Sequence, residues 1–163
     1  MLKKRIVPLL LLSNGRMVKG SSFKNFRDVG DPVTTARVYN AQKVDELFFL
    51  DINPDEKSCK KVYDIVKKVA RECFMPLTIG GGIKSIQDIK AFLDVGADKV
   101  SINTSAFNNL ELIKEASKRF GDQCIVASID YKEVDGQKKV VVNSGKSITK
   151  MCPVEHAKNC AKY

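Results

Sequence analysis

Apolar residues gather in short runs along the chain, and a turn signal follows each run. Five such runs cover residues 5–12, 46–51, 76–80, 98–103 and 124–130. They are rich in Val, Ile, Leu and Phe, which is typical of strands buried on both faces of a parallel sheet. We therefore predict one strand in each run.

Helical patterns separate these runs. They cover residues 31–42, 57–74, 85–96 and 109–121. Asp31 before Pro32 is a helix start, Ser85 with Asp88 forms a capping-box pattern, and Gly96 is a stop signal. Repeated strand–helix units predict an α/β fold, and the pattern alone leaves open a doubly wound sheet or a (β/α)8 barrel.

Two connections are longer than the others. Residues 13–30 follow the first strand and are expected to form a long loop. Residues 131–146 follow the fifth strand, and Asp135-Gly136 between β-prone flanks predicts a small hairpin there. Long loops on one side of a rigid scaffold often carry function.

Length and composition limit the class of protein. The 163 residues fit one globular domain spanning 1–163. No signal peptide and no membrane span are expected, because the first apolar run is short and lacks a cleavage site. Five cysteines without a CxxC pair predict a reduced, cytoplasmic setting.

Lysine and arginine number 28 against 19 acidic residues, so the formal net charge is +9. This excess suits an anionic partner, either a phosphorylated metabolite or nucleic acid, although an ordinary solvated lysine-rich surface is the simpler explanation. Nucleic acid is disfavoured because the lysines form no stripe with interleaved aromatics and no recognition motif is present.

Small and polar residues at two strand ends are candidates for phosphate binding. "TIGGGI" (78–83) ends a strand with glycines, which allow a close approach of the backbone to an anion. Asn103, Thr104 and Ser105 follow the next strand. Purely conformational glycines and ordinary helix capping are the competing explanations.

Charged residues lie at both ends of the expected strands. Asp51 and Asp130 stand at carboxyl ends, where barrel enzymes keep catalytic groups, although a helix cap or a lysine ion pair is the alternative. Arg5, Glu46 and Lys99 stand at amino ends, where they can form a closed ring of ion pairs or remain scattered surface charges.

Cys152, His156 and Cys160 recur every four residues, so they share one helical face that starts at Pro153. The spacing is not that of a structural zinc site, and an ordinary packing face is the favoured interpretation. No metal and no cofactor are expected.

The motifs, taken in order, resemble HisF, the cyclase subunit of imidazole glycerol phosphate synthase. The matching pieces are "KRIVP", "NGRMVKG", "FRDVGDPV", "VDELFFLDI", "PLTIGGGI", "GADKVSIN", "RFGDQCIV", "SID" and "SGK". The resemblance implies a (β/α)8 barrel that pairs with a HisH-type glutamine amidotransferase. It also implies that ammonia enters the bottom of the barrel and reacts at the top with a bis-phosphorylated intermediate in histidine biosynthesis.

The resemblance further implies roles for individual residues. It assigns Asp130 as a catalytic acid or base and places Lys19 on a mobile loop over the substrate. It also assigns one group of residues to the ammonia gate and a second group to the binding of substrate phosphate. The gate set is Arg5, Glu46 and Lys99, and the phosphate set is Gly81, Gly82, Asn103 and Thr104. Asp51 is a further candidate for substrate binding because of its place at a strand end.

One position departs from the family pattern. Leu11 stands where the family has its second catalytic aspartate, and leucine can neither donate nor accept a proton. The "LLLL" run and "ECFMP" resemble a paralogous branch associated with cell-surface polysaccharides, which implies ammonia supply for amidating a sugar. A non-catalytic barrel that scaffolds and activates the amidotransferase is the alternative.

The chain also contains five strand–helix units, where a closed barrel has eight. We therefore expect an incomplete barrel, cut inside its last helix at "NCAKY", without the second phosphate site and one further gate residue.

Overall fold

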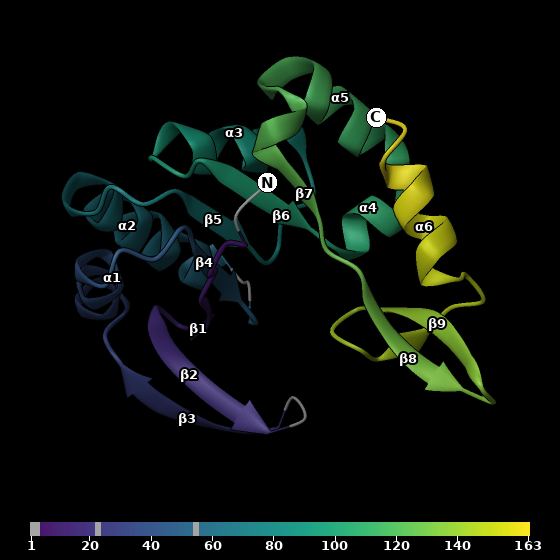
Figure 1. Ribbon diagram of the computed structural model, residues 1–163, viewed down its shortest axis with the longest axis horizontal. Coiled ribbons are helices and arrows are strands. Elements are labelled where there is room, and N and C mark those ends of the chain that lie inside the picture. Colours follow the sequence, from purple (N-terminus) through teal and green to yellow (C-terminus); the bar gives the residue numbers. More distant parts are fainter. Residues whose placement is uncertain (1–3, 22–23, 54–55) are drawn as a thin grey trace. The chain divides into compact units, whose positions relative to one another are not determined.

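Strands and helices alternate along the chain as the hydrophobic pattern predicts (Figure 1). The structure is a computed structural model that describes residues 4–21, 24–53 and 56–163. It divides into unit 1, Met1–Gly82 and Lys90–Val100, and unit 2, Ile83–Ile89 and Ser101–Tyr163. The chain passes between the units three times: after Gly82, inside one helix after Ile89, and inside one strand after Val100. A single domain over 1–163 stays a prediction.

Unit 1 contains most of the main sheet. Its complete elements are β1 (Leu9–Ser13), β2 (Arg16–Ser21), β3 (Lys24–Gly30), α1 (Pro32–Ala41), β4 (Leu47–Asp51), α2 (Glu56–Glu72) and β5 (Leu77–Gly80). It shares α3 (Ile86–Asp94) and β6 (Lys99–Ile102) with unit 2. The strand order is β3-β2-β1-β4-β5, and β6 follows β5.

The register of this sheet sorts its side chains onto two faces. β1, β4 and β5 run parallel, with Leu11 opposite Leu50 and Leu50 opposite Gly80. Because side chains alternate along a strand, these positions share a face with Phe48 and Thr78. Leu12 and Phe49 lie on the opposite face and are fully buried.

Helix α2 packs on the sheet through a stripe of valines. Val62, Val66 and Val69 follow the predicted three- and four-residue spacing, and all three are buried. Tyr63 of the same helix contacts Phe92 of α3 with ring centroids 4.5 Å apart. No helix within residues 4–21, 24–53 and 56–163 has the length and apolar character needed to cross a bilayer.

Unit 2 combines the end of the main sheet with a small antiparallel sheet. Its further elements are α4 (Thr104–Asn108), α5 (Leu110–Phe120), the 3-10 helix η1 (Asp122–Cys124), β7 (Ile125–Ala127), β8 (Asp130–Val134), β9 (Gln137–Val142), β10 (Ser147–Ile148) and α6 (Pro153–Cys160). β9 is the central strand of the small sheet, in the order β10-β9-β8. The predicted hairpin is confirmed: Asp135 and Gly136 both have positive φ, at 52° and 71°.

Four predicted boundaries were wrong. The first strand begins at Leu9, after Pro8, whose nitrogen cannot donate to a ladder. The fifth strand ends at Ala127, and Asp130 instead begins β8, because it pairs with Val141 of β9. α6 ends at Cys160, before the end of the chain.

The fourth correction concerns residues 13–30, which form β2 and β3 instead of a loop. Asn14 and Gly15 make the tight turn between β1 and β2, with φ of 52° and 78°. Lys19 therefore lies on a strand, paired with Arg27 of β3, and its side chain is exposed.

Candidate functional site

Glu46 is the centre of a charged cluster at the amino ends of the strands in unit 1. Its carboxylate accepts hydrogen bonds from Lys99 Nζ at 2.6 Å and from the Thr78 hydroxyl at 2.5 Å. Arg5 Nη1 lies 3.4 Å from the same carboxylate. The structure therefore brings together the three predicted gate residues and adds Thr78.

The cluster holds a charge in a place that is largely closed to water. Glu46 is only 6% exposed, and burial raises the pKa of its carboxyl group. Hydrogen bonds from Lys99 and Thr78, with the charges of Lys99 and Arg5, outweigh burial, so the pKa lies below its ordinary value. Arg5 is mostly exposed, so Lys99 and Thr78 are the main partners.

The sequence analysis did not identify Thr78. The sequence does show a polar side chain inside an otherwise apolar strand. Thr78 pairs in register with Phe48, so the two side chains lie on the same face of the sheet. A buried hydroxyl in such a position needs a hydrogen-bond partner, and here the partner is Glu46.

Asp51 ends β4, as predicted, and its side chain is buried. One carboxylate oxygen accepts from the Ser58 hydroxyl at 2.6 Å, and the other accepts from the backbone N–H of Asn53 at 3.1 Å. These contacts fix the turn after β4 and the first turn of α2. A role in substrate binding stays a prediction.

Gly81 lies directly against Asp51. It has φ of 105°, and a Cβ at this position would overlap the backbone carbonyl oxygen of Asp51. Gly82 also has positive φ, at 70°. The backbone therefore requires glycine at position 81 and favours it at position 82, and phosphate binding by Gly81 and Gly82 stays a prediction.

Leu11 occupies an apolar stretch of the sheet in unit 1. Its neighbours in register are Val18 on β2 and Leu50 on β4. Leu11 is half-buried, and none of these three side chains can transfer a proton.

Asn103, Thr104 and Asp130 meet in unit 2. Asn103 Nδ2 donates to Asp130 Oδ2 at 3.2 Å and to the backbone oxygen of Ser128 at 3.1 Å. The Thr104 hydroxyl donates to Asn103 Oδ1. Asn103 precedes α4 but makes no side-chain capping bond, so the capping explanation is wrong for this residue.

The helical face of Cys152, His156 and Cys160 is a packing face at two of its three positions. His156 and Cys160 are buried, and Phe107 meets the His156 ring edge-on with centroids 5.3 Å apart. Cys152 is exposed. Within the described residues no group of three His, Cys, Asp or Glu side chains is arranged to hold a metal ion.

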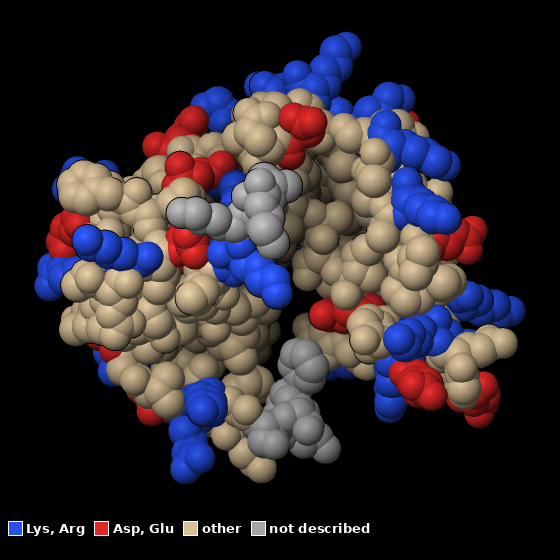
Figure 2. Space-filling view, in the orientation of Figure 1, with Lys and Arg blue, Asp and Glu red and all other residues tan. Residues whose placement is uncertain are grey.

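Basic side chains are dispersed over the face of the molecule that Figure 2 shows. Figure 2 shows blue lysine and arginine side chains interspersed with red acidic ones on the visible face, without a continuous basic stripe. This face therefore lacks the clustered positive charge on which a nucleic-acid interface depends.

Comparison with known proteins identifies the family. Residues 5–163 match the family described as "Histidine biosynthesis protein". The chain is 49% identical over 161 residues to the imidazole glycerol phosphate synthase subunit HisF of Exiguobacterium sp. (strain ATCC BAA-1283 / AT1b). The alignment covers 99% of this chain and 63% of that relative, so the chain spans less than two thirds of its length.

The family match also decides between the two fold classes that the strand–helix pattern allowed. The family has the TIM-barrel fold, which confirms the predicted α/β barrel class over the doubly wound sheet. The motifs that resemble HisF are spread along the matched residues. The chain therefore belongs to the histidine biosynthesis protein family, within which it is similar to HisF.

Proposed function

We propose that the protein is a HisF-type subunit that uses ammonia from a HisH-type glutamine amidotransferase on a phosphorylated substrate. Within this type, we propose the paralogous role, amidation of a sugar for surface polysaccharide synthesis, over formation of imidazole glycerol phosphate. The observation that carries this choice is Leu11 in an apolar setting.

Leu11 removes half of an acid–base pair. General acid–base catalysis by one group contributes roughly 10²–10⁴-fold in rate, so a single remaining aspartate supports ring closure poorly. The neighbours Val18 and Leu50 supply no substitute carboxylate. Amidation needs ammonia and an activated acceptor, and Asp130 alone can assist the single proton transfer.

The Glu46 cluster supports an ammonia entrance. The buried carboxylate of Glu46, which accepts hydrogen bonds from Lys99 and Thr78, is a polar group at the amino ends of otherwise apolar strands. Uncharged ammonia can be passed between such hydrogen-bonding groups. The arrangement fits the gate role that we propose for Arg5, Glu46 and Lys99.

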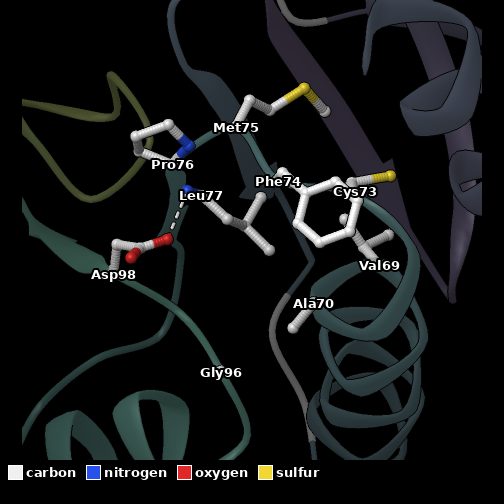
Figure 3. Close-up of a pocket in the computed structure, with 9 residues that line it drawn as sticks. All are labelled: Val69, Ala70, Cys73, Phe74, Met75, Pro76, Leu77, Gly96 and Asp98. Atoms are coloured by element: carbon white, nitrogen blue, oxygen red, sulfur yellow. Dashed lines mark hydrogen bonds between the residues drawn. The ribbon is translucent and has the colours of Figure 1, made fainter. Parts of the chain in front are cut away.

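An exposed aromatic beside this end of unit 1 supports partner docking there. Phe74 is 91% exposed and borders a pocket that Met75, Pro76 and Leu77 also line (Figure 3). The pocket lies at the start of β5, where Asp98 accepts a hydrogen bond from the Leu77 N–H at 2.8 Å. Exposed aromatics beside pockets are typical anchors of protein interfaces.

The test is turnover by the protein together with its amidotransferase. We expect little imidazole glycerol phosphate, a tenfold or greater gain in the Leu11→Asp variant, and no gain in the isosteric control Leu11→Asn, since only the acid transfers a proton (about 10²–10⁴-fold at most). Robust imidazole glycerol phosphate formation with Leu11 in place would refute the paralogous role.

The second candidate function is a scaffold that only activates the amidotransferase. It is favoured by the Glu46 cluster, which needs no substrate site. Asp130→Asn separates the two functions: a scaffold keeps full output in this variant, whereas the amidating subunit loses it and keeps glutamine hydrolysis by the partner.

A further inference from the structure

A continuous chain of hydrogen bonds leads to Asp130 in unit 2. The backbone N–H of Asn143 donates to the Thr104 hydroxyl oxygen at 3.0 Å. The Thr104 hydroxyl donates to Asn103 Oδ1 at 3.2 Å, and Asn103 Nδ2 donates to Asp130 Oδ2 at 3.2 Å. The chain therefore runs from the end of β9, across the start of α4, to the first residue of β8.

The Ser128 carbonyl fixes the direction of the bonds in this chain, because a carbonyl oxygen can only accept. Asn103 therefore turns its NH2 group toward Ser128 and Asp130, which leaves Oδ1 facing Thr104. The Thr104 hydroxyl donates to this oxygen and accepts from the Asn143 N–H. Both amide hydrogens are then used, on the Ser128 carbonyl and the Asp130 carboxylate.

The anchor of the chain is a strained turn. Asn143, Ser144 and Gly145 have φ of 55°, 57° and 78°, three consecutive residues in the left-handed region. This region is unfavourable for side chains other than those of Asn and Asp, and Ser144 is neither. The turn orients the Asn143 N–H, and the Asn143 side chain also donates to the Ser147 hydroxyl at 3.2 Å.

We propose that Thr104 and the turn at Asn143 are positioning elements for Asp130, with Asn103 as the group that contacts its carboxylate. One oxygen of Asp130 is held by Asn103, and the other makes no hydrogen bond within residues 4–21, 24–53 and 56–163. This series of hydrogen bonds from Asn143 through Thr104 and Asn103 to Asp130, which we call the relay, therefore leaves one oxygen of Asp130 free to contact a substrate. This inference rests on the proposed function, in which Asp130 transfers the proton.

The relay also changes the role of two predicted phosphate ligands. The amide of Asn103 and the hydroxyl of Thr104 already have protein partners at each polar atom. While these bonds are intact, neither side chain has a free hydrogen to donate to a phosphate oxygen.

The test removes the Thr104 hydroxyl from the full chain and follows the side-chain amide of Asn103 by 15N relaxation. We expect Thr104→Val to make this amide mobile and to lower kcat about tenfold or more at little change in KM, because orientation of a reacting group is lost. Thr104→Ser should restore both readouts. Thr104→Ala repeats the test if the valine variant does not fold.

Thr149 provides a matched control. Its hydroxyl also accepts from a backbone N–H, that of Met151, and donates to a carbonyl, that of Val140. Thr149→Val should leave the Asn103 amide signals unmoved.

Two outcomes overturn the relay: an unmoved Asn103 amide in Thr104→Val, or a raised KM at unchanged kcat, which would make Thr104 a phosphate ligand. Asp130→Asn tests the underlying function separately. Unchanged turnover in that variant refutes the catalytic role of Asp130, while the amide signals still decide whether the relay exists.

Discussion

The ammonium group of Lys99 lies 2.6 Å from a carboxylate oxygen of Glu46, across 53 residues of sequence. The pair is partly closed to solvent, because the Glu46 side chain is 8% exposed and that of Lys99 is 23% exposed. A surface ion pair contributes little to stability, but breaking a buried pair leaves a charge without compensation.

Lys99→Met should therefore destabilise the protein by about 2–4 kcal/mol, since Glu46 keeps its charge and retains only the neutral Thr78 and the mostly exposed Arg5 as partners. Urea unfolding measures this change. The exposed Lys67→Met is the control and should change stability by less than about 0.5 kcal/mol. Recovery of most of the loss in Glu46→Gln/Lys99→Met would identify the unpaired carboxylate as the cause, and no recovery would contradict it.

Gly81→Ala should cost roughly 3–5 kcal/mol or prevent folding, because the new methyl group meets backbone of Asp51 that cannot move aside. Gly136 also has a positive φ, of 71°, but a Cβ added there would contact no atom within 4 Å. Gly136→Ala should therefore lower the stability by only about 1 kcal/mol. Thermal unfolding of both variants gives the comparison. Equal losses would show that backbone conformation alone, and not the contact with Asp51, explains Gly81.

Acidification should weaken the packing of α6 through His156, the one histidine in the sequence. Burial lowers the pKa of its imidazole below the ordinary 6.5, so between the two values the unfolded chain binds a proton that the folded chain does not. Stability is then complete above pH 6.5 and falls as the pH decreases, by at most about 1.4 kcal/mol per pH unit. His156→Leu should remove this slope in urea titrations between pH 5 and 7.5, and a persistent slope would assign it to other groups.

Phe74→Ala should weaken binding of the amidotransferase about tenfold to a hundredfold while leaving stability unchanged, since an exposed aromatic anchor contributes to the interface and not to the core. Isothermal titration calorimetry measures the affinity. Val154→Ala alters another exposed apolar side chain, on α6 of unit 2, and should leave binding intact. Equal affinities for all three proteins would remove Phe74 from the proposed docking surface.

Local signals in the sequence predicted much of the secondary structure. Asp31 caps α1 by accepting from the Thr34 N–H, and Ser85 and Asp88 form the reciprocal bonds of the expected capping box. Such features succeed because both partners lie within four residues of each other. Each is therefore independent of how the rest of the chain folds.

The errors arose where a distant partner decides the structure. Asp130 looked like the end of an apolar strand, but pairing with Val141 makes it the start of a hairpin. Residues 13–30 form β2 and β3 and not the expected long loop, and Asn14-Gly15 at their start is a strong hairpin signal. Residues 16–30 contain few large apolar side chains, so the two strands leave only a weak hydrophobic pattern in the sequence.

The candidate site was predictable in composition but not in contacts. Arg5, Glu46 and Lys99 could be placed at one end of the strands, because parallel strands begin at one edge. The bond from Thr78 to Glu46 spans 32 positions, the bond from Asn143 to Thr104 spans 39, and the bond from Asn103 to Asp130 spans 27. Only the register of the sheets brings these groups together.

Strand β3 is the outermost strand of the sheet in unit 1, and this has a consequence for handling the protein. An outer strand has unpaired backbone groups to which another chain can hydrogen-bond. The exposed side chains of Phe26 and Val29 make β3 more prone to such association. Arg27 and Asp28 place charges between them, and Asp28 also occupies the Gly30 N–H. Replacing both charged side chains with neutral ones would leave β3 free to pair with strands of other molecules, and the protein would aggregate more readily.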